Sequence, residues 1–178
     1  MPTSTPRTSG SPDPPSRAGW VTLGIAGLTL LVLAFSVPGA LRDAYDQGGF
    51  YLFSRAFLED IPKRLTGPGR FRFILQPLIA TILGIRSGLV DARAGRPPYL
   101  LGLVTGREQR RELARDGLRS IANLLLMGIL LDSVFQWVIL GQSYPGAALV
   151  VGPVLITTPY AIARALSNRA ARSSGSLR

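Results

Sequence analysis

The sequence predicts an all-α integral membrane protein, a helical bundle of four (alternatively three) transmembrane helices with amphipathic helices in the membrane interface. The first observation behind this prediction is that apolar residues gather in continuous runs of helix length, which is typical of membrane spans. The second is that arginine residues flank these runs. The third is the length, because 178 residues accommodate three or four spans and no separate catalytic domain.

Residues 1–18 are rich in proline, serine and threonine, which predicts a disordered tail. Residues 19–42 predict the first span, because the 22 residues from Trp20 to Leu41 carry no charge and Trp20 suits a membrane interface. A signal peptide is the alternative, because Ala34 and Ser36 form a cleavage-like pair of small residues. The run is longer than a typical signal core, which favours a retained span.

Residues 43–70 predict an interfacial amphipathic helix followed by a turn. Within 49–61 the apolar side chains share one helical face, which would lie on the membrane or, equally, pack on the bundle. The turn is expected over 62–70, where proline and glycine recur. The residues of the apolar face are Phe50, Phe53, Phe57, Leu58 and Ile61.

Residues 71–90 are ambiguous between a second span and a re-entrant helix. Only 13 uncharged residues separate Arg72 from Arg86, and Gln76 and Pro77 interrupt them. Counting to Val90, with Arg86 reaching the headgroups, gives enough length to cross. Small residues recur every four positions in this segment, which favours a packed span because they allow helix backbones to approach. These residues are Ala80, Gly84 and Gly88.

Residues 91–117 form a basic juxtamembrane segment, and its helical part is expected to continue into the span at 118–141 as one rod. A short turn then leads to the span at 145–166, which Pro153 and Pro159 should kink, and a basic tail follows at 167–178. Further small packing residues are expected at Gly128, Ala148 and Gly152. The arginines expected to contact lipid headgroups are Arg107, Arg110, Arg111, Arg115 and Arg119.

The distribution of basic residues predicts a cytoplasmic C-terminus. With four spans and both termini inside, 13 lysine and arginine residues are cytoplasmic and six lie outside. With three spans the figures are 18 and two, and the C-terminus is again inside. We therefore expect a multi-pass protein of a bacterial inner membrane whose partners are the anionic headgroups of the bilayer.

The composition argues against several function classes. The sequence contains neither cysteine nor histidine, so disulfides, thiolate chemistry and the usual ligands of zinc and haem are missing. We accordingly expect no cofactor and no metal site. The formal charge of +10 would suit nucleic acid, but the basic residues flank apolar spans, so no nucleic-acid partner is predicted.

Asp132 is the one acidic residue inside an apolar run, and an ionisable residue there is a functional candidate. Gly128, Asp132 and Gln136 share a helical face because they are spaced by four. The side chains expected to form an intramembrane polar cluster are Asp132, Gln136, Gln76, Thr157, Thr158 and Arg86. Either this cluster fixes helix register, or Asp132 couples transport to protons or cations.

Asp116-Gly117, followed by Gly128, Asp132 and Gln136, faintly resembles the motif of the CDP-alcohol phosphatidyltransferases. The family's Ala-Arg pair and last aspartate are replaced here, which argues against that activity, and no catalytic residue set is visible. We expect a non-enzymatic subunit or assembly factor that packs through small-residue helix faces, as a homo-oligomer or with a membrane-protein partner. The alternatives are a small transporter and, third, an enzyme acting on lipid.

Overall fold

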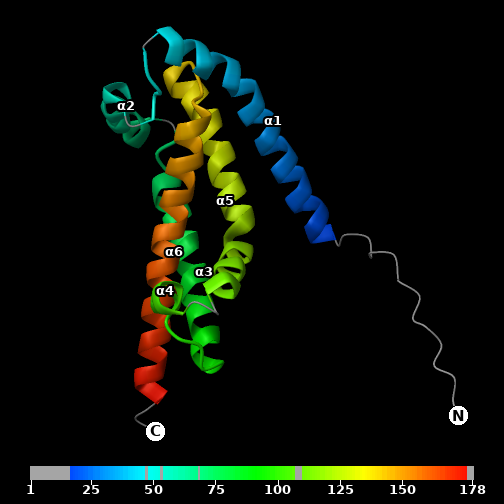
Figure 1. The fold of residues 1–178 in the computed structure, drawn as a ribbon, viewed down its shortest axis with the longest axis vertical. Coiled ribbons are helices and arrows are strands. Elements are labelled where there is room, and N and C mark those ends of the chain that lie inside the picture. Colours follow the sequence, from blue (N-terminus) through cyan, green and yellow to red (C-terminus); the bar gives the residue numbers. More distant parts are fainter. Residues whose placement is uncertain (1–16, 47, 53, 68, 107–109, 176–178) are drawn as a thin grey trace, which may run out of the picture.

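The protein is described here from a computed structural model, which covers residues 17–175 except 47, 53, 68 and 107–109. Four helices among these residues are long and apolar enough to cross a membrane: α1 (Arg17–Asp46), α3 (Arg72–Arg93), α5 (Arg110–Leu140) and α6 (Pro145–Gly175). Two shorter helices, α2 (Arg55–Thr66) and α4 (Tyr99–Thr105), lie beside them (Figure 1). The segment at 71–90 thus belongs to one continuous helix, and the fold is a four-helix membrane bundle.

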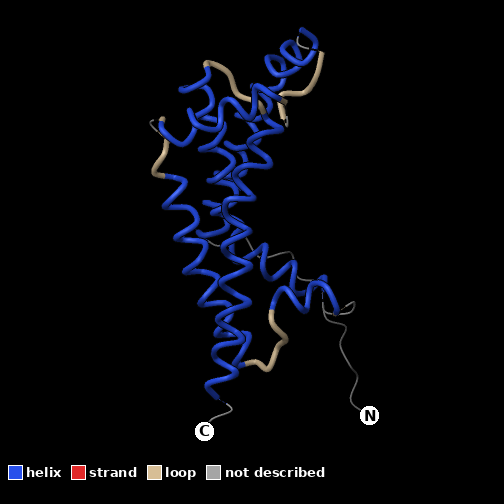
Figure 2. Tube along the Cα trace, turned by 90° about the vertical axis from the view of Figure 1, so that its left-hand side faces the viewer, coloured by secondary structure: helices blue, strands red, loops and turns tan. Residues whose placement is uncertain are grey.

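The bundle has two ends. One end, here called the upper end, holds α2, the start of α3 and the short turn between α5 and α6 (Figures 1 and 2). The other, the lower end, holds α4, the start of α5 and the C-terminal end of α6. The N-terminal end of α1 also points toward the lower end, as expected for an even number of antiparallel spans.

α3 and α6 pack together along straight stripes of residues spaced by four. On α3 the buried stripe begins at Arg72 and ends with Gly84 and Gly88. A Cβ atom added to Gly84 would lie 2.5 Å from the carbonyl oxygen of Tyr160 on α6, so only glycine permits this approach. The apolar core gathers around this contact and comprises Ala80, Tyr99, Leu113, Ile121, Leu125, Ile156 and Tyr160.

α5 and α6 cross at two glycines. A Cβ atom on Gly152 would lie 3.0 Å from the carbonyl carbon of Gly128, and one on Gly128 would lie 2.6 Å from Cδ1 of Ile156. Ala148 is fully buried one turn before Gly152. The small residues singled out in the sequence therefore join α3, α5 and α6 within this chain.

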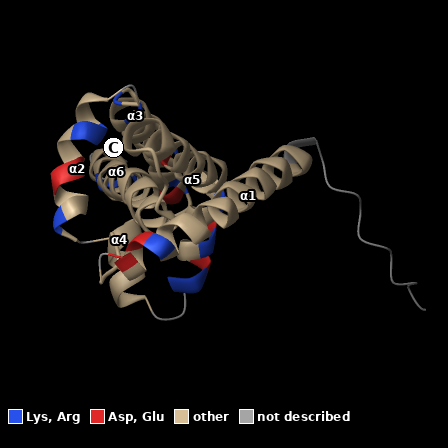
Figure 3. Ribbon diagram, turned by 90° about the horizontal axis from the view of Figure 1, so that it is seen from above, with Lys and Arg blue, Asp and Glu red and all other residues tan. Residues whose placement is uncertain are grey.

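α1 leans away from the other helices, and its N-terminal half projects outward (Figures 1 and 3). It contacts α5, and polar residues recur along it with a spacing of seven, the repeat that keeps them on one helix face. These residues are Thr22, Thr29, Ser36 and Asp43. The Thr29 hydroxyl lies 2.7 Å from the Ile25 carbonyl and 3.4 Å from that of Leu126 on α5.

The structure shifts two expected boundaries. α2 starts at Arg55, because the Ser54 hydroxyl accepts a hydrogen bond from the Phe57 N–H and caps the helix, and it continues through Pro62 to Thr66. Phe53 lies outside the described residues. α6 continues as a helix to Gly175 through most of the predicted tail, where the Asn168 amide donates to the Arg96 carbonyl at 3.2 Å.

Candidate functional site

A buried group of charged residues lies at the upper end of the bundle. Asp132 Oδ1 lies 2.5 Å from Nη2 of Arg72 and 3.3 Å from Nη1 of Arg64, and all three side chains are at most 3% exposed. Gln136 Nε2 donates to Asp132 Oδ2 at 2.6 Å. We call Arg64, Arg72, Asp132 and Gln136 the upper cluster. It joins α2, α3 and α5 through one carboxylate.

Local features of α2, α3 and α5 position the residues of the upper cluster. Arg72 is the first residue of α3 and occupies the helix face that carries the small-residue stripe, so it points into the bundle. Arg64 lies in the last turn of α2, the amphipathic helix capped by Ser54. The side-chain oxygen of Gln136 accepts the Tyr144 N–H at 2.9 Å, which fixes the turn after α5.

Aromatic rings surround both guanidinium groups. The Arg64 guanidinium carbon lies 5.7 Å from the ring centre of Phe57, and that of Arg72 lies 4.9 Å from Phe73 and 5.6 Å from Phe135. Cation–π attraction offsets part of the cost of removing these cations from water.

Tyr51 links the upper cluster to the loop before α2. Its hydroxyl donates to Asp60 at 2.8 Å and accepts from Arg64 Nη2 at 3.4 Å. Its ring stacks on Tyr144 at a centroid distance of 3.7 Å, and the Tyr144 hydroxyl donates to Asp43 of α1 at 2.7 Å. Burial raises the pKa of Tyr51 to about 12, because the charged phenolate is poorly solvated there.

The upper cluster holds two guanidinium groups for one carboxylate. Several of its N–H groups have no hydrogen-bond partner among the described residues, namely Arg64 Nε and Arg72 Nε and Nη1. The side-chain nitrogen of Gln76, one turn after Arg72, is likewise buried and unpaired. Unpaired buried donors are costly. The cluster therefore has an excess of positive charge and of donors.

A second charged group, the lower cluster, comprises Asp91, Arg96, Asp116 and Arg164. Arg164 is 1% exposed and binds both oxygens of Asp91, from Nε at 2.6 Å and from Nη2 at 3.0 Å. Nη2 also donates to Asp116 at 2.8 Å, and the guanidinium carbon lies 4.4 Å from the Tyr99 ring centre. The lower cluster joins α3, α5 and α6 and is balanced in charge.

The two clusters are far apart along the helices. Arg72 and Asp91 both belong to α3, and at 1.5 Å per residue their Cα atoms are separated by about 28 Å along the helix axis. This separation is close to the hydrocarbon thickness of roughly 30 Å. The upper and lower clusters thus lie about one hydrocarbon thickness apart along α3.

The structure brings together part of the predicted polar cluster. Asp132 and Gln136 are hydrogen-bonded, and the Gln76 amide lies beside them, 3.8 Å from where a Cβ atom of Gly128 would stand. The other three members lie elsewhere: Arg86 and Thr158 are exposed, and the Thr157 hydroxyl donates to the Pro153 carbonyl at 2.7 Å. Asp132 pairs with Arg64 and Arg72 and not with Arg86.

Sequence reasoning missed Arg64, Arg72, Asp91 and Arg164. One signal was available, because Arg72 and Gln76 continue the spacing of four that leads to Ala80, and Arg164 follows Tyr160 in the same way on α6. Arg64 had no such signal, because its segment reads as an interfacial turn. Of the predicted headgroup arginines, Arg107 lies outside the described residues, and the others are exposed: Arg110, Arg111, Arg115 and Arg119.

A cleft of about 590 Å³ opens between α1, α3 and α5. Thr22 and Ile25 of α1 form one side, Leu83 of α3 forms the other, and α5 contributes polar groups that include Ser120 and Asn123. Both of these α5 residues are exposed. A polar face within a span is a favourable surface for another helix, because helix pairs in membranes associate through side-chain hydrogen bonds and close packing.

Comparison with family models, with curated proteins and with solved structures finds no match to this chain. The described residues contain no group of three or more acidic side chains that could hold a metal ion. Functional inference therefore depends on the two charged clusters and the cleft.

Proposed function

We propose that the protein is a non-enzymatic, multi-pass membrane subunit that binds a transmembrane helix of a partner membrane protein in the cleft between α1, α3 and α5. The observation that carries this proposal is the exposed Asn123 in that cleft. An amide facing lipid lacks hydrogen-bond partners, whereas a partner helix can supply them.

The packing residues support this assignment of the binding face. Gly84, Gly128 and Gly152 are occupied by contacts within the chain, so they are unavailable to a partner. By contrast, a Cβ atom added to Gly24 or Gly27 of α1 would meet nothing within 4 Å. These two glycines leave the projecting half of α1 able to approach another helix closely.

The contacts of Asp132 favour a structural role for this residue over a transport role. Its carboxylate accepts from two guanidinium groups and one amide, and it is 1% exposed. A coupling carboxylate would need a route for protons or cations and would have to release these partners in each cycle. A buried acid with this set of partners serves better as the point that fixes α2 and α3 on α5.

Site-specific cross-linking tests the proposed cleft. A photo-reactive amino acid at Asn123 is expected to capture a second membrane protein in native membranes, and native mass measurement of the extracted complex should show a heteromer. Ile85 is the matched control, because it is exposed at a similar depth on the opposite side of α3. Equal capture from Asn123 and Ile85, or capture only of a second copy of this chain, would overturn the proposal.

We further propose a bacterial inner membrane with both termini in the cytoplasm. The lower end of the bundle carries most of the basic residues, in line with the excess of positive charge expected in cytoplasmic segments. The chain has no cysteine, so single cysteines at exposed Glu59 and Ser174 can be labelled without background. An impermeant maleimide added to intact spheroplasts should label position 59 alone; labelling of position 174 alone would reverse the assignment.

A further inference from the structure

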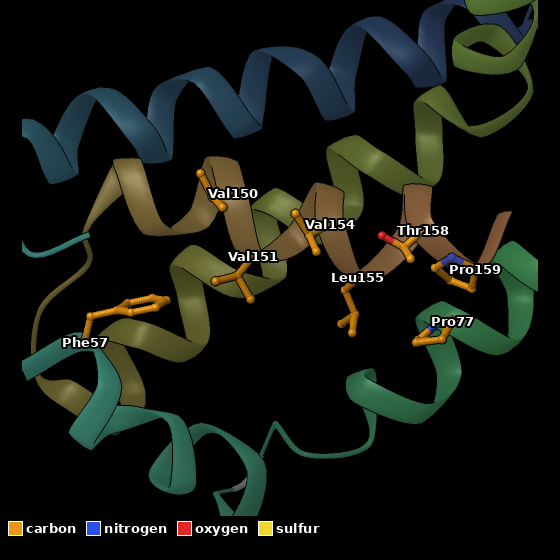
Figure 4. A pocket seen from close by; sticks show the side chains of 8 residues that line it. All are labelled: Phe57, Pro77, Val150, Val151, Val154, Leu155, Thr158 and Pro159. Atoms are coloured by element: carbon orange, nitrogen blue, oxygen red, sulfur yellow. The ribbon is translucent and has the colours of Figure 1, made fainter. Parts of the chain in front are cut away.

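A second surface, separate from the cleft, lies between α2, α3 and α6. It is an apolar groove of about 550 Å³ that begins beside Phe57 and ends at Pro77 and Pro159 (Figure 4). Its wall on α6 runs from Val150 to Pro159, which spans about 13 Å along the helix axis. The groove therefore follows the direction of the membrane-spanning helices.

The upper end of the groove adjoins the upper cluster. Phe57 lines the groove, and its ring lies 5.7 Å from the guanidinium carbon of Arg64. At the other end of the groove, Pro77 directly follows Gln76, whose side-chain nitrogen is buried and unpaired. A molecule lying in the groove thus has apolar walls along most of its length and cationic groups at one end.

Charge decides what kind of molecule fits. Arg64 and Arg72 are at most 3% exposed and share the single carboxylate of Asp132, so one buried positive charge is unbalanced. The nearby pair of Lys63 and Asp60 does not change this excess, because its own charges cancel. A buried cation without a counter-ion is unfavourable, and guanidinium N–H groups bind phosphate oxygens well.

We propose that the groove and the upper cluster form a binding site for one anionic phospholipid. Its phosphate takes the N–H groups of Arg64 and Arg72 that Asp132 leaves unused, and an acyl chain lies in the groove between α2, α3 and α6. The unused N–H groups are buried and neither arginine lines the groove, so side chains at its upper end must move to admit the headgroup. The site is distinct from the exposed arginines of the lower end, which face headgroups in general.

The position of the site agrees with the depth of the helices. Arg72 and Asp91 lie about one hydrocarbon thickness apart along α3, so the proposed site puts Arg72 at a boundary, where lipid phosphates stand, and the groove extends from there toward the membrane centre. Headgroup and chain therefore enter the site in the orientation that they already have in the bilayer. A soluble anion would use the charged end only and would leave the groove empty.

The test is lipid retention by the full-length protein. The protein is extracted in neutral detergent, mixed with equal amounts of phosphatidylglycerol and phosphatidylcholine, and analysed by native mass spectrometry. One phosphatidylglycerol per chain is expected in preference to phosphatidylcholine. Arg72→Gln leaves one arginine for one aspartate. This variant should weaken the preference for phosphatidylglycerol roughly tenfold, the value of one charge-assisted hydrogen bond. Arg115→Gln, an exposed arginine of the lower end, should retain it.

A second variant tests the groove without touching the charges. Val154 is 55% exposed and lines the groove, so Val154→Trp should fill the groove and reduce lipid retention. The control is Leu149→Trp, which should not reduce retention, because Leu149 is 50% exposed on α6 outside the groove lining. This pair decides the question if Arg72→Gln fails to fold. Equal retention of both lipids by the wild type overturns the site. Three other results also overturn it: lipid retention that Val154→Trp leaves unchanged, displacement of the lipid by inorganic phosphate alone, and a loss of preference in Arg115→Gln equal to that in Arg72→Gln.

Discussion

Replacing Asp132 by asparagine should strongly destabilise the bundle. The side chain keeps its shape, but Arg64 and Arg72 then remain buried, at most 3% exposed, with no counter-ion. Removing one partner of a buried ion pair typically costs about 3–5 kcal/mol. The upper value applies more closely here, because two cations lose the same carboxylate and Gln136 loses its acceptor.

The assay is unfolding in neutral detergent, followed by circular dichroism against denaturant or temperature. Glu59→Gln is the matched control, because Glu59 pairs with Arg55 on the surface and its loss should change the free energy of unfolding by about 0.5 kcal/mol or less. A triple variant with Asp132→Leu, Arg64→Met and Arg72→Met should recover most of the stability, since an apolar replacement of a buried ion group is often neutral. An Asp132→Asn variant as stable as Glu59→Gln would refute the reasoning, and loss of a transport activity in such a stable variant would favour the transporter alternative.

Three further outcomes follow from the packing and from one titrating group. Gly84→Leu should disrupt the contact between α3 and α6 and abolish a stable fold. Gly27→Leu should leave thermal stability unchanged, because a Cβ atom there meets open space. Equal melting temperatures of the two variants would argue against this pairing of α3 with α6. Arg164→Lys should cost about 1–3 kcal/mol of unfolding free energy, since lysine cannot bind both oxygens of Asp91, and an unchanged denaturation midpoint would contradict that. Tyr51 contributes stability that is fully present below its unfolded pKa of 10.0 and is lost as the pH rises through about 12, because its pKa is raised in the fold. Tyr51→Phe should reduce this alkaline dependence of the melting temperature between pH 10 and 12 without abolishing it, because burial also raises the pKa of Tyr144. A dependence unchanged by Tyr51→Phe would assign it to other groups.

The two charged clusters show where sequence reasoning reached its limit. The small residues at Gly84, Gly88, Gly128 and Gly152 are recognisable because their spacing needs only helix periodicity, which is a local property. Asp132 is equally visible as a charge in an apolar run. Arg72 continues the spacing of four on α3, but periodicity does not reveal that it pairs with Asp132. Arg64 gave no signal, because its pairing with Asp132 across 68 residues depends on how α2 folds back on the bundle.

The sequence by itself determined the all-α membrane class of the protein and the absence of cysteine and histidine chemistry, and it left three or four spans open. Hydrophobicity decides these properties, since a helix of sufficient apolar length partitions into a bilayer whatever its neighbours are. Only the tertiary structure decided that Asp132 faces two arginines, that the glycine stripes are used within the chain, and that α1 leaves a cleft. The physical reason is that a buried charge is stabilised by atoms within a few ångströms, and helix packing, which periodicity alone does not specify, selects those atoms.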